Sequence, residues 1–214
     1  MIGFMPEIYP DELLYSMFAR YYERSGYMAY IFAAEDLFQN KNERPDVEFI
    51  NRLTQDAQSV IHKKMSADEV IMNHTMFPYY GRFLGKERRT EAYFALLNTD
   101  GNYRNLLPIP KAKRQRFLRY CPMCVNMDRD KYGETYWHRI HQMQSIDRCP
   151  VHFCVLQNTD IAIGSTTSPR FSAAENMIKD FEKIEVVEDE KERKLVRVNP
   201  EFCVNSLQDL QDDI

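Results

Sequence analysis

Two pairs of potential metal ligands constrain this sequence more than any other feature. Cys121 and Cys124 form a C-x2-C pair, and Cys149 and His152 form a C-x2-H pair after a spacer of 24 residues. Three thiolates and one imidazole match the tetrahedral sites that Zn²⁺ occupies in proteins. A proline follows the first cysteine of each pair and helps to fix a tight turn there. The pattern therefore predicts one structural Zn²⁺ per chain.

Other uses of the cysteines explain less of the pattern. The sequence starts without a basic region followed by an apolar run and has no 18-residue apolar window, so we expect a cytoplasmic protein without a membrane span. Five cysteines in that reducing compartment argue against a disulfide framework. A thioredoxin-like redox pair would leave the C-x2-H pair unexplained, and no βαβ pattern flanks it. We interpret Cys154, whose spacing to Cys149 is poorer than that of His152, as a small buried apolar residue.

The residues before the cysteines have helical periodicity. Acidic first turns, a capping box at Ser66 and Glu69, and Gly26 as a stop predict helices over residues 11–25, 30–38, 46–62, 66–73 and from about 86 onward. The first two helices have the outline of a helix-turn-helix, which is equally the outline of any helical hairpin.

The fold class that follows is mainly α with a small α+β zinc-knuckle or zinc-ribbon module. We expect a helical, helix-turn-helix-like domain over residues 1–108, a zinc module with an inserted helix over 109–160, and a mixed, acidic extension over 161–214. The formal net charge is −4, but residues 1–170 hold 22 Lys/Arg against 20 Asp/Glu, whereas residues 171–214 hold 6 against 12. The acidity therefore belongs to the C-terminal extension.

A basic stretch stands directly before the first cysteine pair. Its five cations are interleaved with aromatic residues and contain no acid; they are Lys111, Lys113, Arg114, Arg116 and Arg119. Such side chains bind backbone phosphates, so we interpret the stretch as a DNA contact. Aromatic residues in a linker are, however, just as often packed inward.

The spacer between the ligand pairs raises the question of catalysis. In GETYWHRIHQM, the residues Glu134, His138 and His141 would share one face of a helix, a spacing that can bind a catalytic metal. No HExxH motif, P-loop, GxGxxG or Ser-His-Asp arrangement accompanies them. We therefore favour a structural role, with Tyr136 and Trp137 as core anchors.

Five sequence blocks, taken together, resemble one family. The blocks are YPDELLYSMFARY, HTMFPYYGRFLG, RYCPMC, DKYGETYWHRIHQM and CPVH, and they lie between about residues 5 and 157. Their order and spacing are similar to those of the TniQ/TnsD target-selection proteins of Tn7-like transposons, which include CRISPR-associated ones. The sequence departs from the family pattern at Arg82, where comparable members carry a proline. Members that read a DNA site directly are longer, so we expect either a short adaptor or part of a longer protein.

The resemblance implies a target-selection adaptor that is not an enzyme. Such an adaptor binds target DNA or an RNA-guided CRISPR effector complex and recruits a TnsC-like AAA+ ATPase that regulates the transposase. The metal ligands carried over are the four residues of the two pairs. The structural motif residues carried over are His74, Phe77, Pro78, Tyr79, Glu134, Tyr136, Trp137 and His141.

A second hypothesis is an autonomous, sequence-specific DNA-binding regulator that contains zinc. It would place base contacts on the helix near residues 30–38, which carries no Arg, Asn or Lys for bidentate readout. The adaptor predicts weak DNA binding by the chain alone, whereas the regulator predicts tight and selective binding. The sequence specifies neither the target site nor the oligomeric state.

Overall fold

The computed structural model describes residues 2–98, 103–109, 116–163, 170–179 and 184–186, together with 190, 191 and 193. In chain order the elements are α1 (Leu14–Ser25), α2 (Tyr30–Leu37), α3 (Gln55–His62), α4 (Ala67–His74), α5 (Phe77–Gly81), α6 (Lys86–Leu97), α7 (Tyr103–Leu106), β1 (Arg116–Tyr120), α8 (Pro122–Tyr132), η1 (Ile140–Gln142), β2 (Gln157–Ile163) and α9 (Ala174–Met177). The expected predominance of helix with a small sheet is confirmed. No helix in the described part of the chain is long and apolar enough to span a membrane.

Helix α1 ends where the sequence predicts and begins three residues later than expected. Gly26 caps its end with a left-handed φ of 70°, a conformation that glycine adopts without a steric penalty. The predicted start at Asp11 is wrong because Asp11 itself has a φ of 55°. Its carboxylate instead accepts hydrogen bonds from the Ile140 N–H at 2.9 Å and the Arg139 Nε at 3.1 Å. A contact with a segment far along the sequence thus replaces the first helical turn.

The predicted helix over residues 46–62 is correct only in its second half. Asp46 Oδ1 accepts the N–H groups of Glu48 and Phe49, each at 3.0 Å, and this local turn competes with helix formation. Helix α3 begins only after Thr54, whose hydroxyl caps it by accepting the Ala57 N–H at 3.1 Å.

Two other predicted helix starts are correct. Ser66 and Glu69 form both hydrogen bonds of a capping box at the start of α4. Helix α6 begins at Lys86, immediately after Gly85.

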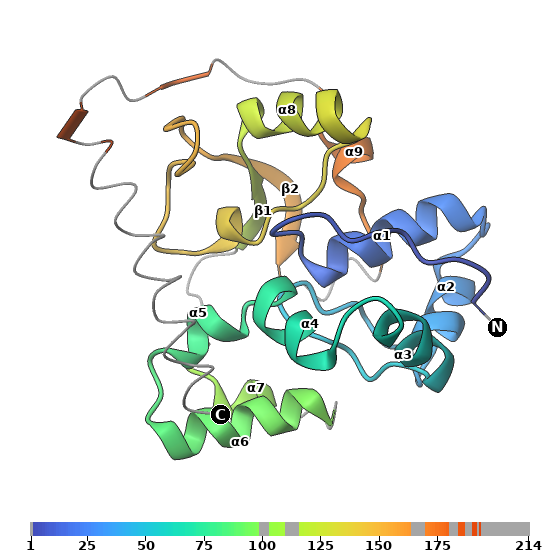
Figure 1. Ribbon diagram of the computed structural model, residues 1–214. Coiled ribbons are helices and arrows are strands. Elements are labelled where there is room, and N and C mark those ends of the chain that lie inside the picture. The colour runs from blue at the N-terminus through green and yellow to red at the C-terminus, as the bar shows by residue number, and fades with distance from the viewer. Residues whose placement is uncertain are drawn as a thin grey trace.

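The sheet consists of β1 and β2, which pair antiparallel. Arg119 lies opposite Asn158 and Tyr120 opposite Gln157, with an irregularity in the register between Phe117 and Arg119. Helix α8 leaves the end of β1, and α8 and α9 lie on one side of the sheet while α3 to α7 lie on the other (Figure 1). Both β2 and the short helix α9 follow the second ligand pair in the sequence.

The buried apolar side chains form one continuous cluster that extends across the predicted boundary at residue 108. Trp137, which is fully buried, is central to this continuity. Its backbone N–H donates to the Ser16 hydroxyl at 3.0 Å, and its carbonyl accepts the Leu13 N–H at 3.0 Å. The start of α1 is therefore packed directly against the segment between the two ligand pairs (Figure 1).

Candidate metal centre

The first ligand pair lies where a strand passes into a helix. Cys121 follows β1 and is the N-cap residue of α8, and Pro122 takes the first helical position, where a missing N–H costs nothing. The Cys121 sulfur accepts the Cys124 N–H at 3.3 Å. The C-x2-C spacing thus becomes the first turn of α8, with both sulfurs on the same side.

The second pair lies in a tight turn stabilised by backbone hydrogen bonds. The Phe153 N–H donates to the Cys149 carbonyl and the Cys149 N–H donates to the Cys154 carbonyl, each at 2.8 Å. Phe153 takes a left-handed φ of 59°, which closes the turn. The Cys149 sulfur accepts the His152 N–H at 3.5 Å. This turn repeats the arrangement of the first pair, in which a backbone amide points at the first sulfur.

The two turns bring four ligand atoms together. The three sulfurs and one imidazole nitrogen all lie within 4.8 Å of one another, and the three cysteines are buried. The Cys124 and Cys149 sulfurs are 3.7 Å apart, and His152 Nδ1 is 3.5 Å from the Cys121 sulfur, 3.2 Å from that of Cys124 and 3.8 Å from that of Cys149. Zinc–sulfur bonds of about 2.3 Å in a tetrahedron place sulfurs roughly 3.8 Å apart. The four residues therefore fit a tetrahedral metal ion.

The pKa values of the clustered thiols favour one thiolate, which can bind a cation. Hydrogen bonds from the Cys121 and Cys124 thiols lower the pKa of Cys149, so one thiolate is favoured within the cluster. Hydrogen bonding with Cys124, Cys149 and Cys154 raises the pKa of Cys121, and burial adds to this effect. A metal ion would therefore release protons as it binds, which makes binding weaker at acidic pH.

Two further residues lie beside the four ligands. The Cys154 sulfur is 3.1 Å from the Cys121 sulfur and fully buried. His141 Nε2 is 3.7 Å from the Cys124 sulfur, and burial lowers the pKa of His141, which keeps the imidazole neutral. A neutral imidazole protonated at Nε2 would donate to the Cys124 thiolate and orient it. The proximity of Cys154 is consistent with its place in the sequence, but nothing in the spacing of His141 indicated that it lies here.

The predicted helical face of Glu134, His138 and His141 does not form. Only residues 140–142 of this segment are helical, as the short 3-10 helix η1. Glu134 Oε1 accepts from Arg20 at 2.9 Å, and His138 Nε2 lies 2.8 Å from Asp128 Oδ2. Within the described residues, the ligands Cys121, Cys124, Cys149 and His152 are the one group of three or more that is placed to hold a metal ion.

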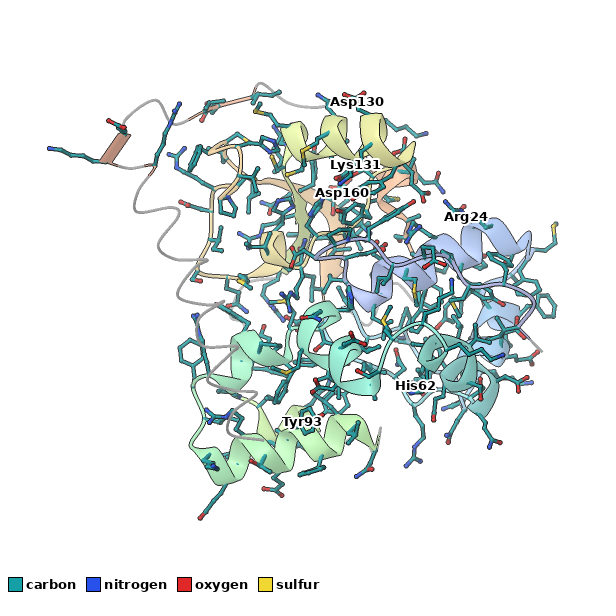
Figure 2. The ribbon with its side chains drawn as sticks, viewed as in Figure 1. Arg24, His62, Tyr93, Asp130, Lys131 and Asp160 are labelled. Atoms are coloured by element: carbon teal, nitrogen blue, oxygen red, sulfur yellow. The ribbon has the colours of Figure 1, made fainter. Side chains whose placement is uncertain are left out.

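Glu134 belongs to a buried network of ion pairs that the sequence did not reveal. Arg20, with 2% of its side chain exposed, pairs with the fully buried Glu12 at 2.7 Å and with Glu134 at 2.9 Å. Arg24, labelled on α1 in Figure 2, pairs with the same oxygen of Glu134. The Tyr9 hydroxyl donates to it at 3.0 Å. The network joins α1 to the segment that follows α8.

The remaining motif residues lie in the interior. Phe77, Pro78 and Tyr79 are buried at the start of α5. His74 Nδ1 lies 2.7 Å from the Glu12 carbonyl, and burial lowers the pKa of His74. Among the aromatic residues after α8, the Tyr136 hydroxyl donates to the Pro10 carbonyl at 3.0 Å.

The basic stretch is described only in part. Lys111, Lys113 and Arg114 lie outside the described residues. Arg116 forms an ion pair with Glu48 at 2.7 Å, and Arg119 donates from its guanidinium to main-chain carbonyls of the loop over residues 143–146. Both described arginines are thus engaged within the fold.

Comparison with known proteins covers the metal centre and the helices before it. A model of the TniQ family matches residues 4–156, which include all four ligands. The transposition protein TnsD of transposon Tn7 from Escherichia coli is 29% identical over 152 residues, which are 69% of this chain and 30% of TnsD. The chain thus spans less than a third of the length of that relative. From the extent of the family match, the chain belongs to the TniQ family.

Proposed function

We propose that this protein is a target-selection adaptor of a Tn7-like transposon and acts without catalysis in the bacterial cytoplasm. It binds target DNA or a targeting complex, such as an RNA-guided CRISPR effector, and it recruits a TnsC-like AAA+ ATPase that regulates the transposase. The observation that carries the proposal is the family match over residues 4–156, which includes both the N-terminal helices and the complete set of metal ligands.

In this proposal the metal is Zn²⁺ and its role is structural. All four ligand positions of a tetrahedral ion are supplied by protein side chains, which leaves no open position for water or substrate. The ion would hold the turn at the start of α8 against the turn at Cys149 and His152. This role agrees with the ion pair of Glu134 and the contact of His138 with Asp128, which engage both residues outside a second metal site.

Exposed apolar side chains support the recruitment of a protein partner. Phe94 and Leu97 lie three residues apart on α6 and are 47% and 36% exposed, and Phe83, just before this helix, is 63% exposed. Large apolar side chains on the surface are typical of protein contacts. We assign these residues to contact with the ATPase.

An autonomous reader of DNA sequence is less well supported. Helix α2 would be the reading helix of a helix-turn-helix, and its sequence YIFAAEDL has two acids and no Arg, Lys, Asn or Gln. Acidic side chains repel backbone phosphates, and base readout relies on amides and guanidinium groups. We therefore propose that the protein contacts the DNA backbone without reading its sequence.

The test is binding of the purified chain to duplex DNA at about physiological salt, with and without the AAA+ ATPase from the same transposon and ATP. We expect weak binding by the chain alone and tight binding of a ternary complex. Phe94→Glu should abolish the gain from the ATPase and leave the binding of DNA by the chain alone unchanged. If the ATPase fails to bind this chain under any condition, the adaptor proposal is wrong. Tight and sequence-selective binding by the chain alone would establish the regulator instead.

A further inference from the structure

A hollow of about 310 Å³ lies at the junction of the sheet and the helical part. Its lining includes Arg116, Phe117 and Arg119 of β1, Asn158 of β2 and Gln144 of the loop after η1. Among the residues that the structure describes, no Asp or Glu lines it. The lining therefore includes two arginines and three residues with side-chain amides.

The two arginines differ in how their charge is balanced. Glu48 accepts two hydrogen bonds from Arg116, at 2.7 and 3.0 Å, so that charge is neutralised by a buried carboxylate. Arg119 donates to the carbonyls of Ile146 and Met143, both at 2.6 Å. Carbonyl groups fix the direction of a guanidinium without cancelling its charge.

The positive charge of Arg119 is therefore available to a ligand. Within the described part of the chain no carboxylate lies within ion-pair distance of Arg119, and Asp147 acts on it only through space. Burial lowers the pKa of Arg119, yet a guanidinium remains protonated at neutral pH. A partly buried cation without an anionic partner favours the binding of an anion.

The neighbouring groups add donors and more positive charge. Asn158 lies opposite Arg119 in the β1–β2 ladder and is exposed. Gln144 is also exposed, and its amide nitrogen lies 3.3 Å from the Tyr80 hydroxyl. In the sequence, Lys111, Lys113 and Arg114 directly precede the strand that lines the hollow.

We propose that this hollow binds a backbone phosphate of duplex DNA, with Arg119 as the guanidinium ligand and Asn158 and Gln144 as amide donors. The inference rests on the proposed function, because it assigns the DNA contact of the adaptor to one place. In this proposal the guanidinium of Arg119, on β1, contacts a DNA phosphate. This contact adds to any contact made by the basic residues that precede β1 in the sequence.

The experiment introduces a negative charge at exposed positions of the hollow. Asn158→Asp and Gln144→Glu are compared with Asn73→Asp on α4 and Gln55→Glu on α3, which make the same chemical changes at exposed positions outside the hollow. Binding of a fluorescent duplex of about 20 base pairs and mixed sequence is measured by anisotropy at several salt concentrations. Metal content and near-ultraviolet circular dichroism of each variant verify that it is folded.

The two hollow variants should bind the duplex at least about fivefold more weakly than the controls. The slope of log affinity against log salt should become shallower by about 0.9, the value of one lost phosphate contact. Equal affinity of hollow and control variants would overturn the phosphate site and leave the adaptor proposal standing. Failure of the unaltered protein to bind DNA, with or without the ATPase, would contradict the DNA contact as a whole.

A second measurement follows Arg119 directly. In a ¹⁵N-labelled protein the Arg119 Nε–H resonance, assigned with Arg119→Lys, should shift when the duplex is added. Inorganic phosphate is the matched small anion, and it should shift the same resonance only at much higher concentration. A shift with inorganic phosphate but none with the duplex would identify a small-anion site and refute the DNA assignment.

Discussion

The helical part, residues 14–97, and the Cys/His part, residues 116–163, are stabilised in different ways. In the helical part, helices bury large apolar side chains such as Leu37, Ile71 and Phe77, and α4 begins with a capping box. The Cys/His part has one helix of 11 residues, a two-stranded sheet and a 3-10 turn. A part with so little regular structure needs additional cross-links, and a metal ion held by the four candidate ligands would supply them. The difference teaches that loss of the metal and loss of a helix cap should affect different parts of one molecule.

The largest effect should follow loss of one metal ligand. Cys121→Ser should remove the ion and unfold the Cys/His part, because binding of structural zinc contributes on the order of 10 kcal/mol to folding. Metal content by mass spectrometry and thermal unfolding measure the outcome. Cys203→Ser is the matched control and should retain one ion per chain. A Cys121→Ser protein with full metal content and an unchanged melting curve would show that the Cys/His part does not depend on a metal ion bound by Cys121.

A smaller effect should follow disruption of the ion pairs that join the two parts. Arg20→Met leaves Glu12 buried without its partner, and breaking such a pair costs about 3–5 kcal/mol. Because the network joins α1 to Glu134, both parts should lose stability together. Trp137, the single tryptophan, lies at this junction, so its fluorescence reports the change in denaturant.

The matched control for Arg20→Met is the double variant Glu12→Gln, Arg20→Met. Without the buried carboxylate it should recover part of the lost stability. If only the Cys/His part were destabilised in Arg20→Met, the network would belong to that part and would not join the two.

Acidification should lower the stability of the helical part through His74. Burial lowers the pKa of His74 in the folded protein, so the unfolded chain takes up a proton first as the pH falls below about 6.5. Stability should therefore decrease with falling pH between that value and the lowered pKa, by at most about 1.4 kcal/mol per pH unit from this residue. Denaturant titrations at several pH values on the protein and on His74→Gln measure the slope. An identical slope in both proteins would mean that other groups, such as the metal ligands, account for all of it.

The smallest effect should follow loss of the α4 cap. Ser66→Ala removes the hydroxyl that accepts the Glu69 N–H and should cost about 1 kcal/mol. Metal content should remain at one ion per chain, because α4 is separate from the ligand turns. Ser66→Thr, which keeps the cap, should retain most of the stability. A fall in metal affinity in Ser66→Ala would show that the two parts are coupled more tightly than their packing suggests.

Local signals in the sequence predicted the features that depend on neighbouring residues. The end of α1 at Gly26 and the capping box of α4 follow from backbone preferences that act within a few residues. The C-x2-C pair likewise forms its turn from Cys121 and Pro122 alone. One prediction failed at Asp11, where a distant contact with the segment at Ile140 competed, and another failed at Asp46, where a local side-chain turn competed.

The segment GETYWHRIHQM illustrates what periodicity cannot predict. Its residues have helical spacing, yet Trp137 packs against the start of α1, and Glu134 and His138 bind different partners. Trp137 binds Ser16, Glu134 binds Arg20 and His138 binds Asp128, and these hydrogen bonds hold the segment in a non-helical conformation. Each partner lies at least 10 residues away in the sequence. Contacts over such separations override a local preference.

By itself, the sequence determined which four residues are the candidate metal ligands, the helical character of the first half and the membership in a family, because each depends on residue type and spacing. Only the tertiary structure decided that His141 lies beside Cys124, that Glu134 serves an ion-pair network, and that Arg116 pairs with Glu48 whereas Arg119 donates to main-chain carbonyls. These outcomes depend on which distant groups a folded chain places within about 3–4 Å, and hydrogen bonds and ion pairs act only at that range.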